Sequence, residues 1–327
     1  MDARWWRSRA LNAALGCEPV ITASRKRNLL LVATAALLAS AFPVTLTDAL
    51  KRPVRVSQPP QRIISLAPSV TEMLFALGLG PRVVGVTDYC DYPPEAPKRE
   101  HIGGIVNPSL ERVVALHADL VVGVRINPTS VFAQLDRARV VNFALNPLDI
   151  AGVLSDLHTL GRLTGAQREA DDLIADLKSR LDEVRWKLDA LSEAERPRVL
   201  FVSSCAPQIW TAGSETWVDD VIRRAGGRNL AADRKDFHTI TMETLLRRQP
   251  EVIILAAGMT DEARTGDIGV FWGLPGAEAL TAVKEHRVFA VPSDPLLRPG
   301  PRLVDAVYTM AWVLHPERMR RERVQPD

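Results

Sequence analysis

The chain has few of the residues that build disulfide frameworks and metal sites. It contains three cysteines in 327 residues, with no Cys-x-x-Cys pair and no zinc-finger spacing. Its six histidines are scattered singly along the chain. The sequence therefore indicates neither a disulfide-dense scaffold nor a structural zinc site.

Signatures of catalysis and of nucleic-acid binding are also missing. The chain has no Gly-x-Ser-x-Gly, no His-Glu-x-x-His and no phosphate-binding loop. Its net charge is +2, but the first 41 residues hold six basic and two acidic residues. The remainder has 35 basic and 37 acidic residues, a net charge of −2. This balance does not favour nucleic acid or an anionic membrane surface as a partner.

The N-terminus has the pattern of an export signal. A basic triplet, Arg25-Lys26-Arg27, precedes an apolar run of 11 residues from Leu29 to Ala39. Ala39-Ser40-Ala41 then matches the small-x-small cleavage pattern. The run is shorter than the ~20 residues that a transmembrane helix needs. We expect cleavage after Ala41, and an uncleaved N-terminal anchor is the alternative.

An internal repeat is the most informative feature of the sequence. Residues 109–122 align with residues 241–254 without a gap. Each segment has a hydroxyl residue that can cap a helix, a short helix and then a β-branched strand. Glu111 and Glu243 occupy the same position in the two copies. A repeat of this period predicts two similar lobes with a ligand-binding cleft between them.

Short apolar runs alternate with helical patterns on both sides of a long helical segment. Residues 62–66, 83–87, 120–124 and 140–143 are expected strands of the first lobe, and 198–202, 252–256 and 287–291 of the second. Such alternation is typical of parallel sheets. The predicted fold is α/β, with two Rossmann-like lobes joined by a single long backbone helix.

The middle of the chain predicts that connecting helix. Asp149 can cap a first helix, and Gly165 interrupts the pattern. From Ala166 to about Leu191 the chain has neither Gly nor Pro, and apolar residues recur at steps of three and four. The expected domains are a signal region at 1–41, a linker at 42–60, an N-terminal lobe at 61–148, a helical connector at 149–196, a C-terminal lobe at 197–314 and a polar tail at 315–327.

Loops that follow the strands supply the candidate binding residues, because ligands of such sheets meet the carboxyl ends of the strands. Aromatic and apolar side chains dominate these loops, with Asp294 and Arg298 as polar groups. Tyr89, Trp210 and Phe237 are the aromatic candidates. The composition indicates a large, flat, partly apolar ligand.

Three motifs resemble the helical-backbone class of periplasmic binding proteins, which serve ATP-driven importers of cobalamin, haem and ferric siderophores. They are RIISLAPSVTE at 62–72, GVTDYCDYPP at 85–94 and NPSLE at 107–111, and the similarity spans residues 61–314. Within the class, the second motif is most similar to cobalamin-binding members. The resemblance implies a periplasmic, monomeric binding protein with cobalamin or a related corrinoid as transported ligand. It implies no catalysis, no cofactor, no bound metal and no nucleic-acid partner.

The resemblance also implies roles for individual residues. Tyr89, Trp210 and Phe237 would contact the corrin, and Asp294 and Arg298 would make polar contacts. Ile105 stands where the cobalamin binder has a tryptophan, so one ring contact is lost. Glu111 and Glu243 would meet arginines on the two permease subunits, which work with ATPase subunits.

Other functions stay open at this point. A haem binder would need an axial ligand, for which Tyr89, His101 and His238 are available. A siderophore binder would need several basic groups, and Arg298 is a single one. An α/β enzyme would use Asp294 and a histidine of the cleft as acid and base.

Two cysteines lie beyond the signal region. Cys90 and Cys205 fall in loops expected on opposite sides of the cleft. A disulfide needs Cα atoms within about 7 Å and would clamp the cleft shut. We therefore expect two unbridged thiols.

Overall fold

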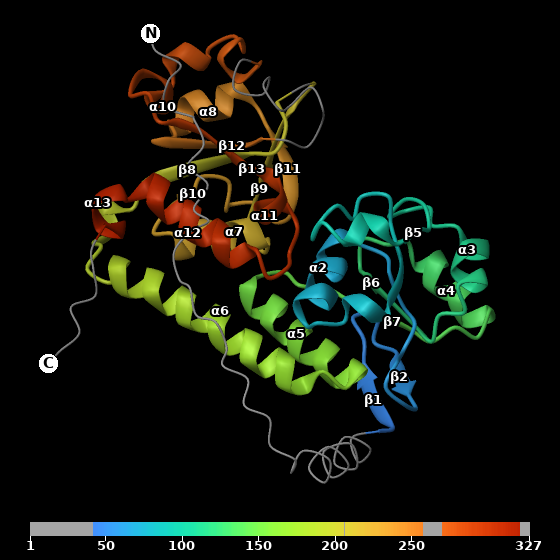
Figure 1. The fold of residues 1–327 in the computed structure, drawn as a ribbon. Helices are drawn as coiled ribbons and strands as arrows, with labels where there is room; N and C mark the ends of the chain where they lie inside the picture. Colours follow the sequence, from blue (N-terminus) through green and yellow to red (C-terminus); the bar gives the residue numbers. More distant parts are fainter. Residues whose placement is uncertain (1–41, 206, 258–269, 321–327) are drawn as a thin grey trace, which may run out of the picture. The chain divides into compact units, whose positions relative to one another are not determined.

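The computed structural model describes residues 42–320 except 206 and 258–269. All of these residues belong to one unit that starts at Phe42. The expected signal region and the last seven residues of the expected tail lie outside the described residues. Figure 1 shows two α/β lobes and a helical connector along one side of them. The predicted fold class is confirmed.

The N-terminal lobe is built on a five-stranded sheet in the order β5-β4-β3-β6-β7. All neighbouring strands in it are parallel. Its strands are β3 (Ile63–Ser65), β4 (Val83–Val86), β5 (Glu100–His101), β6 (Leu120–Val124) and β7 (Asn142–Leu145), and its helices are α2 (Pro68–Ala76), α3 (Leu110–Ala115) and α4 (Thr129–Arg137). β6 is buried along its whole length. Helices on both faces of a parallel sheet explain why such a strand is a continuous apolar run.

The C-terminal lobe has a four-stranded parallel sheet in the order β10-β8-β12-β13. An additional antiparallel pair, β9 with β11, lies beside it. The strands are β8 (Arg198–Val202), β9 (Ile209–Ala212), β10 (Arg228–Asn229), β11 (Phe237–Ile240), β12 (Val252–Ala257) and β13 (Val288–Pro292). The helices are α7 (Trp217–Arg224), α8 (Met242–Arg248), α10 (Thr281–Lys284), α11 (Ser293–Leu297), α12 (Leu303–Leu314) and α13 (Pro316–Met319).

Two helices form the connector. α5 (Ile150–Thr164) starts at the predicted cap, where the Asp149 carboxylate accepts a hydrogen bond of 2.6 Å from the Gly152 amide. It ends at Gly165, whose φ of 76° suits a residue without a side chain. α6 (Gln167–Leu188) follows and has 22 residues, about 33 Å at 1.5 Å per residue. Its apolar stripe packs against α5, α12 and α13.

Two expectations about irregular segments are wrong. The expected linker contains an antiparallel hairpin of β1 (Val44–Thr47) and β2 (Pro53–Val56). Its strands are short and one begins with proline, so the alternating pattern is weak. The expected polar tail contains α13, whose Met319 is 1% exposed. Lys187 of α6 donates a hydrogen bond of 2.9 Å to the Met319 carbonyl, which a sequence pattern cannot show.

The largest group of buried apolar residues includes side chains of both lobes and of the connector. Each lobe also has a smaller cluster of its own beneath the helices on its outer face. Contacts across the connector therefore hold the lobes as one packed unit. Among the described residues, no helix has the length and apolar character needed to span a membrane.

Candidate functional site

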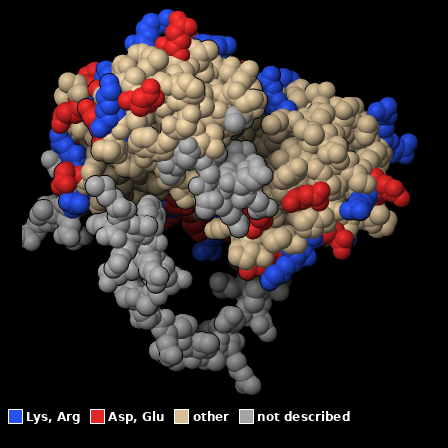
Figure 2. Space-filling view, turned by 90° about the horizontal axis from the view of Figure 1, so that it is seen from above, with Lys and Arg blue, Asp and Glu red and all other residues tan. Residues whose placement is uncertain are grey.

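A cavity of about 580 Å³ lies between the lobes. It is lined by Tyr89, Ile105, Asp294 and Arg298, four of the six ligand-binding residues expected from the sequence. Its other lining residues are Ala67, Pro68, Ser69, Asp88, Asp91, Val124, Arg125, Ile126, Asn146, Pro147, Trp217, Ser293, Leu297 and Pro299. In Figure 2 the charged side chains lie mostly around the edges of the face in view, and uncharged residues form most of its centre.

The lining residues follow the carboxyl ends of parallel strands. Tyr89 lies in the loop after β4, Ile105 after β5 and Ile126 after β6, while Asp294 and Arg298 follow β13. Because all strands of a parallel sheet end at the same edge, loops distant in sequence meet there. This is why four of the residues proposed from the sequence line the same cavity.

A buried amide holds the first-lobe loops in place. Asn127 is 1% exposed, and its Nδ2 atom donates to the carbonyl of Ile105 at 2.7 Å and to that of Leu66 at 3.0 Å. Its Oδ1 atom accepts a hydrogen bond of 2.7 Å from the Val124 amide. One side chain thus ties together the segments after β3, β5 and β6, and sets where Ile105 meets the cavity.

The aromatic wall of the second lobe differs from expectation. Trp217, which the sequence analysis did not single out, lines the cavity, and its indole Nε1 donates a hydrogen bond of 2.9 Å to the Leu296 carbonyl. Phe237 packs behind it, with the two ring centroids 5.3 Å apart. Trp210 lies on β9 opposite Thr239 and is 42% exposed. Neither Phe237 nor Trp210 is among the residues that line the cavity.

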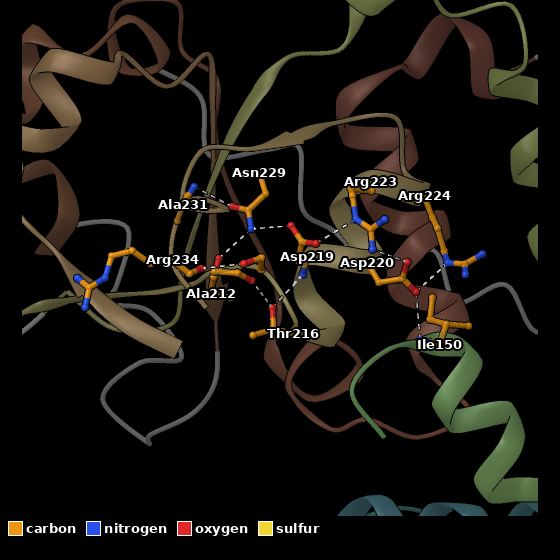
Figure 3. Close-up of polar contacts among 12 residues, drawn as sticks. Ile150, Ala212, Thr216, Asp219, Asp220, Arg223, Arg224, Asn229, Ala231 and Arg234 are labelled. Atoms are coloured by element: carbon orange, nitrogen blue, oxygen red, sulfur yellow. Dashed lines mark hydrogen bonds and ion pairs between the residues drawn. The ribbon is translucent and has the colours of Figure 1, made fainter. Parts of the chain in front are cut away.

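The first turns of α7 fix the place of Trp217. Thr216 caps the helix by accepting a hydrogen bond from the Asp219 amide. Asp220 is 5% exposed and accepts a hydrogen bond of 3.1 Å from the amide of Ile150, the first residue of α5. Figure 3 shows how Asp220 is also paired with Arg223 and Arg224 of its own helix. The helix that carries Trp217 is therefore tied to the start of the connector. The only sequence signal for Trp217 is its position directly after Thr216, a residue that can cap a helix.

A group of ion pairs links the lobes at the cavity. Arg298 binds both carboxylate oxygens of Asp91, and the Nη2–Oδ2 distance is 3.0 Å. Its Nη2 atom is also 3.1 Å from Asp294. Arg302 donates from Nε to Glu72 Oε2 at 2.9 Å. Sequence reasoning did not find Asp91, Glu72 or Arg302, because their partners are about 200 residues away and no local pattern marks them.

The two repeated glutamates are exposed, as a docking role requires. Glu111 and Glu243 lie in the first turns of α3 and α8, which are capped by Ser109 and Thr241 respectively. Neither carboxylate forms an ion pair with any of the described residues. A negative charge at a helix N-terminus stabilises the helix modestly, and this accounts for part of their placement.

No histidine of the described residues is among those that line the cavity, although His101 contacts one of them. His101 Nδ1 is 3.2 Å from Asp88 and its Nε2 is 3.1 Å from the Pro97 carbonyl. His238 is 8% exposed and contacts the Asp236 carbonyl. Tyr89 is the one of the three axial-ligand candidates that lines the cavity. Within the part of the chain that the structure describes, no group of three or more His, Cys, Asp or Glu side chains is arranged to hold a metal ion.

Cys90 is a buried free thiol, so no disulfide joins it to the buried Cys205. The predicted absence of a bridge across the cleft is confirmed. Cys90 Sγ lies 3.1 Å from the hydroxyls of both Thr71 and Thr87. Burial raises the pKa of the Cys90 thiol, so the neutral form is favoured at neutral pH.

Comparison with known proteins identifies the family. The family model of the periplasmic binding proteins matches residues 63–295. The chain belongs to the periplasmic binding protein family. It is therefore the substrate-binding component of an ABC transporter and not an enzyme, and the enzyme alternative is set aside.

Individual relatives extend this finding without deciding the ligand. An uncharacterised ABC transporter substrate-binding lipoprotein of Bacillus subtilis (strain 168), YvrC, is 32% identical over 280 residues, which cover 84% of this chain and 87% of that protein. The periplasmic vitamin B12 binding protein BtuF of Vibrio cholerae has a TM-score of 0.69 and 27% identity, and the match covers 80% of this chain and 99% of that one. The periplasmic haem-binding protein RhuT of Roseiflexus sp. RS-1 has a TM-score of 0.70, 27% identity and coverage of 79% and 99%.

Proposed function

We propose that this protein binds cobalamin or a related corrinoid between its lobes and delivers it to an ABC importer. The observation that carries the proposal is the cavity of about 580 Å³ whose wall comes from both lobes. Tyr89, Ile105, Ile126 and Trp217 give it an apolar and aromatic lining. Binding cavities of this kind bury an apolar ligand body and orient it with few polar groups.

The polar groups of the cavity also suit a ligand with many amides. Asp294 and Arg298 lie on the second-lobe side, where they can accept and donate hydrogen bonds. The vitamin B12 binder of Vibrio cholerae shares the fold and 27% of aligned residues, which supports the same ligand class here.

Haem is the second candidate. Tyr89 is 60% exposed and lines the cavity, and a tyrosine can serve as an axial haem ligand. The haem-binding relative from Roseiflexus is as similar in fold as the vitamin B12 binder. A ferric siderophore is a third candidate of the same class.

Calorimetric titration with cyanocobalamin and with haem tests the choice. We expect cyanocobalamin to bind and to raise the melting temperature, since a ligand that binds only the folded state stabilises it. The absorption spectrum of protein purified from its own host gives an independent answer, because corrinoids and haem differ in colour. Tight haem uptake with no heat from any corrinoid would overturn the proposal.

We further propose that the two exposed glutamates, Glu111 and Glu243, dock on the permease, one from each lobe. The protein is exported, and we propose cleavage after Ala41 and release into the periplasm. Its relative from Bacillus subtilis is named a lipoprotein, so a membrane-anchored form is the alternative. Mass spectrometry of the exported protein distinguishes the two, because a chain released after Ala41 begins at Phe42 and an anchored chain retains residues before Phe42.

A further inference from the structure

We propose that Asp91 is a charge filter in the cavity: by neutralising Arg298 it makes the site select ligands that carry no negative charge where they meet this arginine. The inference deepens the proposed function, on which it rests, by naming the charge class of the ligand.

The first observation is that the guanidinium of Arg298 is already bound by carboxylates. Asp91 from the first lobe binds it through two oxygens, and Asp294 from its own helix lies 3.1 Å away. Glu72 Oε1 lies 4.0 Å from the Nη1 atom of Arg298. The Arg298 side chain is only 17% exposed. A ligand carboxylate that approaches this arginine meets the carboxylates of Asp91 and Asp294, and like charges placed together in a poorly hydrated site are costly.

The second observation is the charge balance of the whole group. The group contains three carboxylates and two cations. The carboxylates are Glu72, Asp91 and Asp294, and the cations are Arg298 and Arg302. The hydrogen bond from Arg298 lowers the pKa of Asp91, which keeps that carboxylate ionised at neutral pH. Burial raises the pKa of Glu72, and Arg302 opposes this effect. With Glu72 ionised the group carries one net negative charge, and with Glu72 protonated it is neutral. Neither state has spare positive charge.

The lining has two other charged residues, Asp88 and Arg125, and both are exposed. Asp88 is 3.2 Å from His101. The Arg125 side chain has no hydrogen-bond or ion-pair partner among the described residues, so an anion could be held there. The proposed selection therefore applies to the part of the ligand that meets Arg298.

The arrangement separates two kinds of large chelate. Amide groups can donate to the oxygens of Asp91 and Asp294 and accept from the guanidinium, so a ligand with neutral amides fits without breaking the pair. Propionates or catecholates would face two carboxylates at this end of the cavity. Like charges placed against each other cost free energy and so discriminate against the charged partner.

A matched pair of corrinoids provides the test. Cyanocobalamin is compared with its monocarboxylates, in each of which one side-chain amide is hydrolysed to an acid, and the dissociation constants are measured at low and moderate salt. We expect wild-type protein to prefer the neutral ligand over the most disfavoured acid by about tenfold or more. Asp91→Asn, which keeps the shape but removes the carboxylate that binds Arg298 through two oxygens and leaves Asp294 beside it, should reduce that ratio. Asp88→Asn is the control, because it removes one charge from the same cavity but no partner of Arg298, and it should change the ratio much less.

The outcomes separate the filter from other roles of Asp91. Equal weakening of neutral and acidic corrinoids in Asp91→Asn would show that Asp91 merely holds the lobes together, and would overturn the inference. So would a wild-type protein that binds both kinds of corrinoid equally. If no corrinoid binds, the proposed function fails, and two ferric chelates then test the filter by itself. Preference for a positively charged trihydroxamate over a negatively charged tricatecholate supports it, and the reverse preference overturns it.

Discussion

The two lobes share one arrangement of helices and strands but differ where they line the cavity. α3 with β6 and α8 with β12 have the same order, and a hydroxyl side chain caps each helix at the amide three residues on, Ser109 in one lobe and Thr241 in the other. Both helices are followed by a non-glycine residue with left-handed backbone, His117 with φ 48° after α3 and Gln249 with φ 49° after α8. Such a conformation is uncommon for residues with a side chain. Its recurrence at the same position shows that the repeat preserves backbone geometry as well as sequence pattern.

Strand pairing is repeated as well. Ile63 of β3 pairs with Leu120 of β6, and Val199 of β8 pairs with Val252 of β12. The positions of Leu120 and Val252 correspond in the repeat alignment. The strand orders also correspond. The order β4-β3-β6-β7 in the first lobe matches β10-β8-β12-β13 in the second.

The lobes diverge at the cleft. The first lobe meets the cavity with loops that carry Tyr89, Ile105 and Ile126, while the second inserts the antiparallel pair of β9 and β11 and lines the cavity with Trp217 of α7. The two lobes thus share a scaffold but line the cavity with different loops. The wall of the cavity is therefore asymmetric. The proposed docking residues therefore lie in the part that the lobes share, and the proposed ligand-binding residues lie in the part that differs.

Loss of docking should be the largest effect, because it removes the shared feature from both lobes. We expect Glu111→Ala with Glu243→Ala to abolish most transport and permease capture, and to leave ligand affinity and melting temperature nearly unchanged. Each single change should cause a partial loss of similar size. Asp171→Ala with Asp172→Ala on α6 is the control, because it removes the same charge from an exposed face of the connector.

Capture of the double variant on the reconstituted transporter, at low and high salt, measures the effect. Exposed charge pairs chiefly steer and orient partners, and salt weakens them. Capture at the wild-type level in low salt would reject the docking role. A parallel loss of ligand affinity would instead assign the two glutamates to the cleft.

The aromatic wall of the second lobe should show the next largest effect. We expect Trp217→Ala to weaken cyanocobalamin binding by about 1–3 kcal/mol, the range of buried anchor residues. Phe237→Ala should weaken it less, because Phe237 supports Trp217 from behind. Trp210→Ala should have the smallest effect of the three. Titration calorimetry that ranks Trp210 first would restore the assignment made from sequence.

The smallest effect concerns the carboxylate that holds each repeated strand. Asp119 accepts hydrogen bonds from the amides of Gln61 and Arg62 at 2.8 and 2.9 Å, whereas Glu251 accepts one from the Arg198 amide at 2.7 Å. We expect Asp119→Ala to lower the free energy of unfolding by about 1–2 kcal/mol and Glu251→Ala by about 0.5–1 kcal/mol.

Urea unfolding of both variants tests this difference between the lobes. Asp119→Asn keeps one acceptor and should fall between wild type and Asp119→Ala. Equal losses for Asp119→Ala and Glu251→Ala would show that the number of amides bound is not what matters, and that the two lobes are equivalent at this point.

Local features of the fold were predictable from the sequence because their causes lie within a few residues. The caps at Ser109, Asp149 and Thr241 each satisfy the amide three positions away, and Gly165 ends α5 with its own backbone. Buried parallel strands need continuous apolar runs, so most of them were located within two residues. The hairpin before residue 60 was not predicted, because two four-residue strands carry too little periodicity to distinguish them from a linker.

The sequence by itself determined the duplicated scaffold, the connector and most of the loops that line the cavity, since repeats, caps and apolar runs act at short range. Only the tertiary structure decided which side chains of those loops face the cavity. Trp217 replaces Trp210 there because the contact of Asp220 with Ile150 ties α7 to the connector. Arg298 binds Asp91 because two segments distant in sequence come together where the lobes pack. The net charge around Arg298 depends on this ion pair.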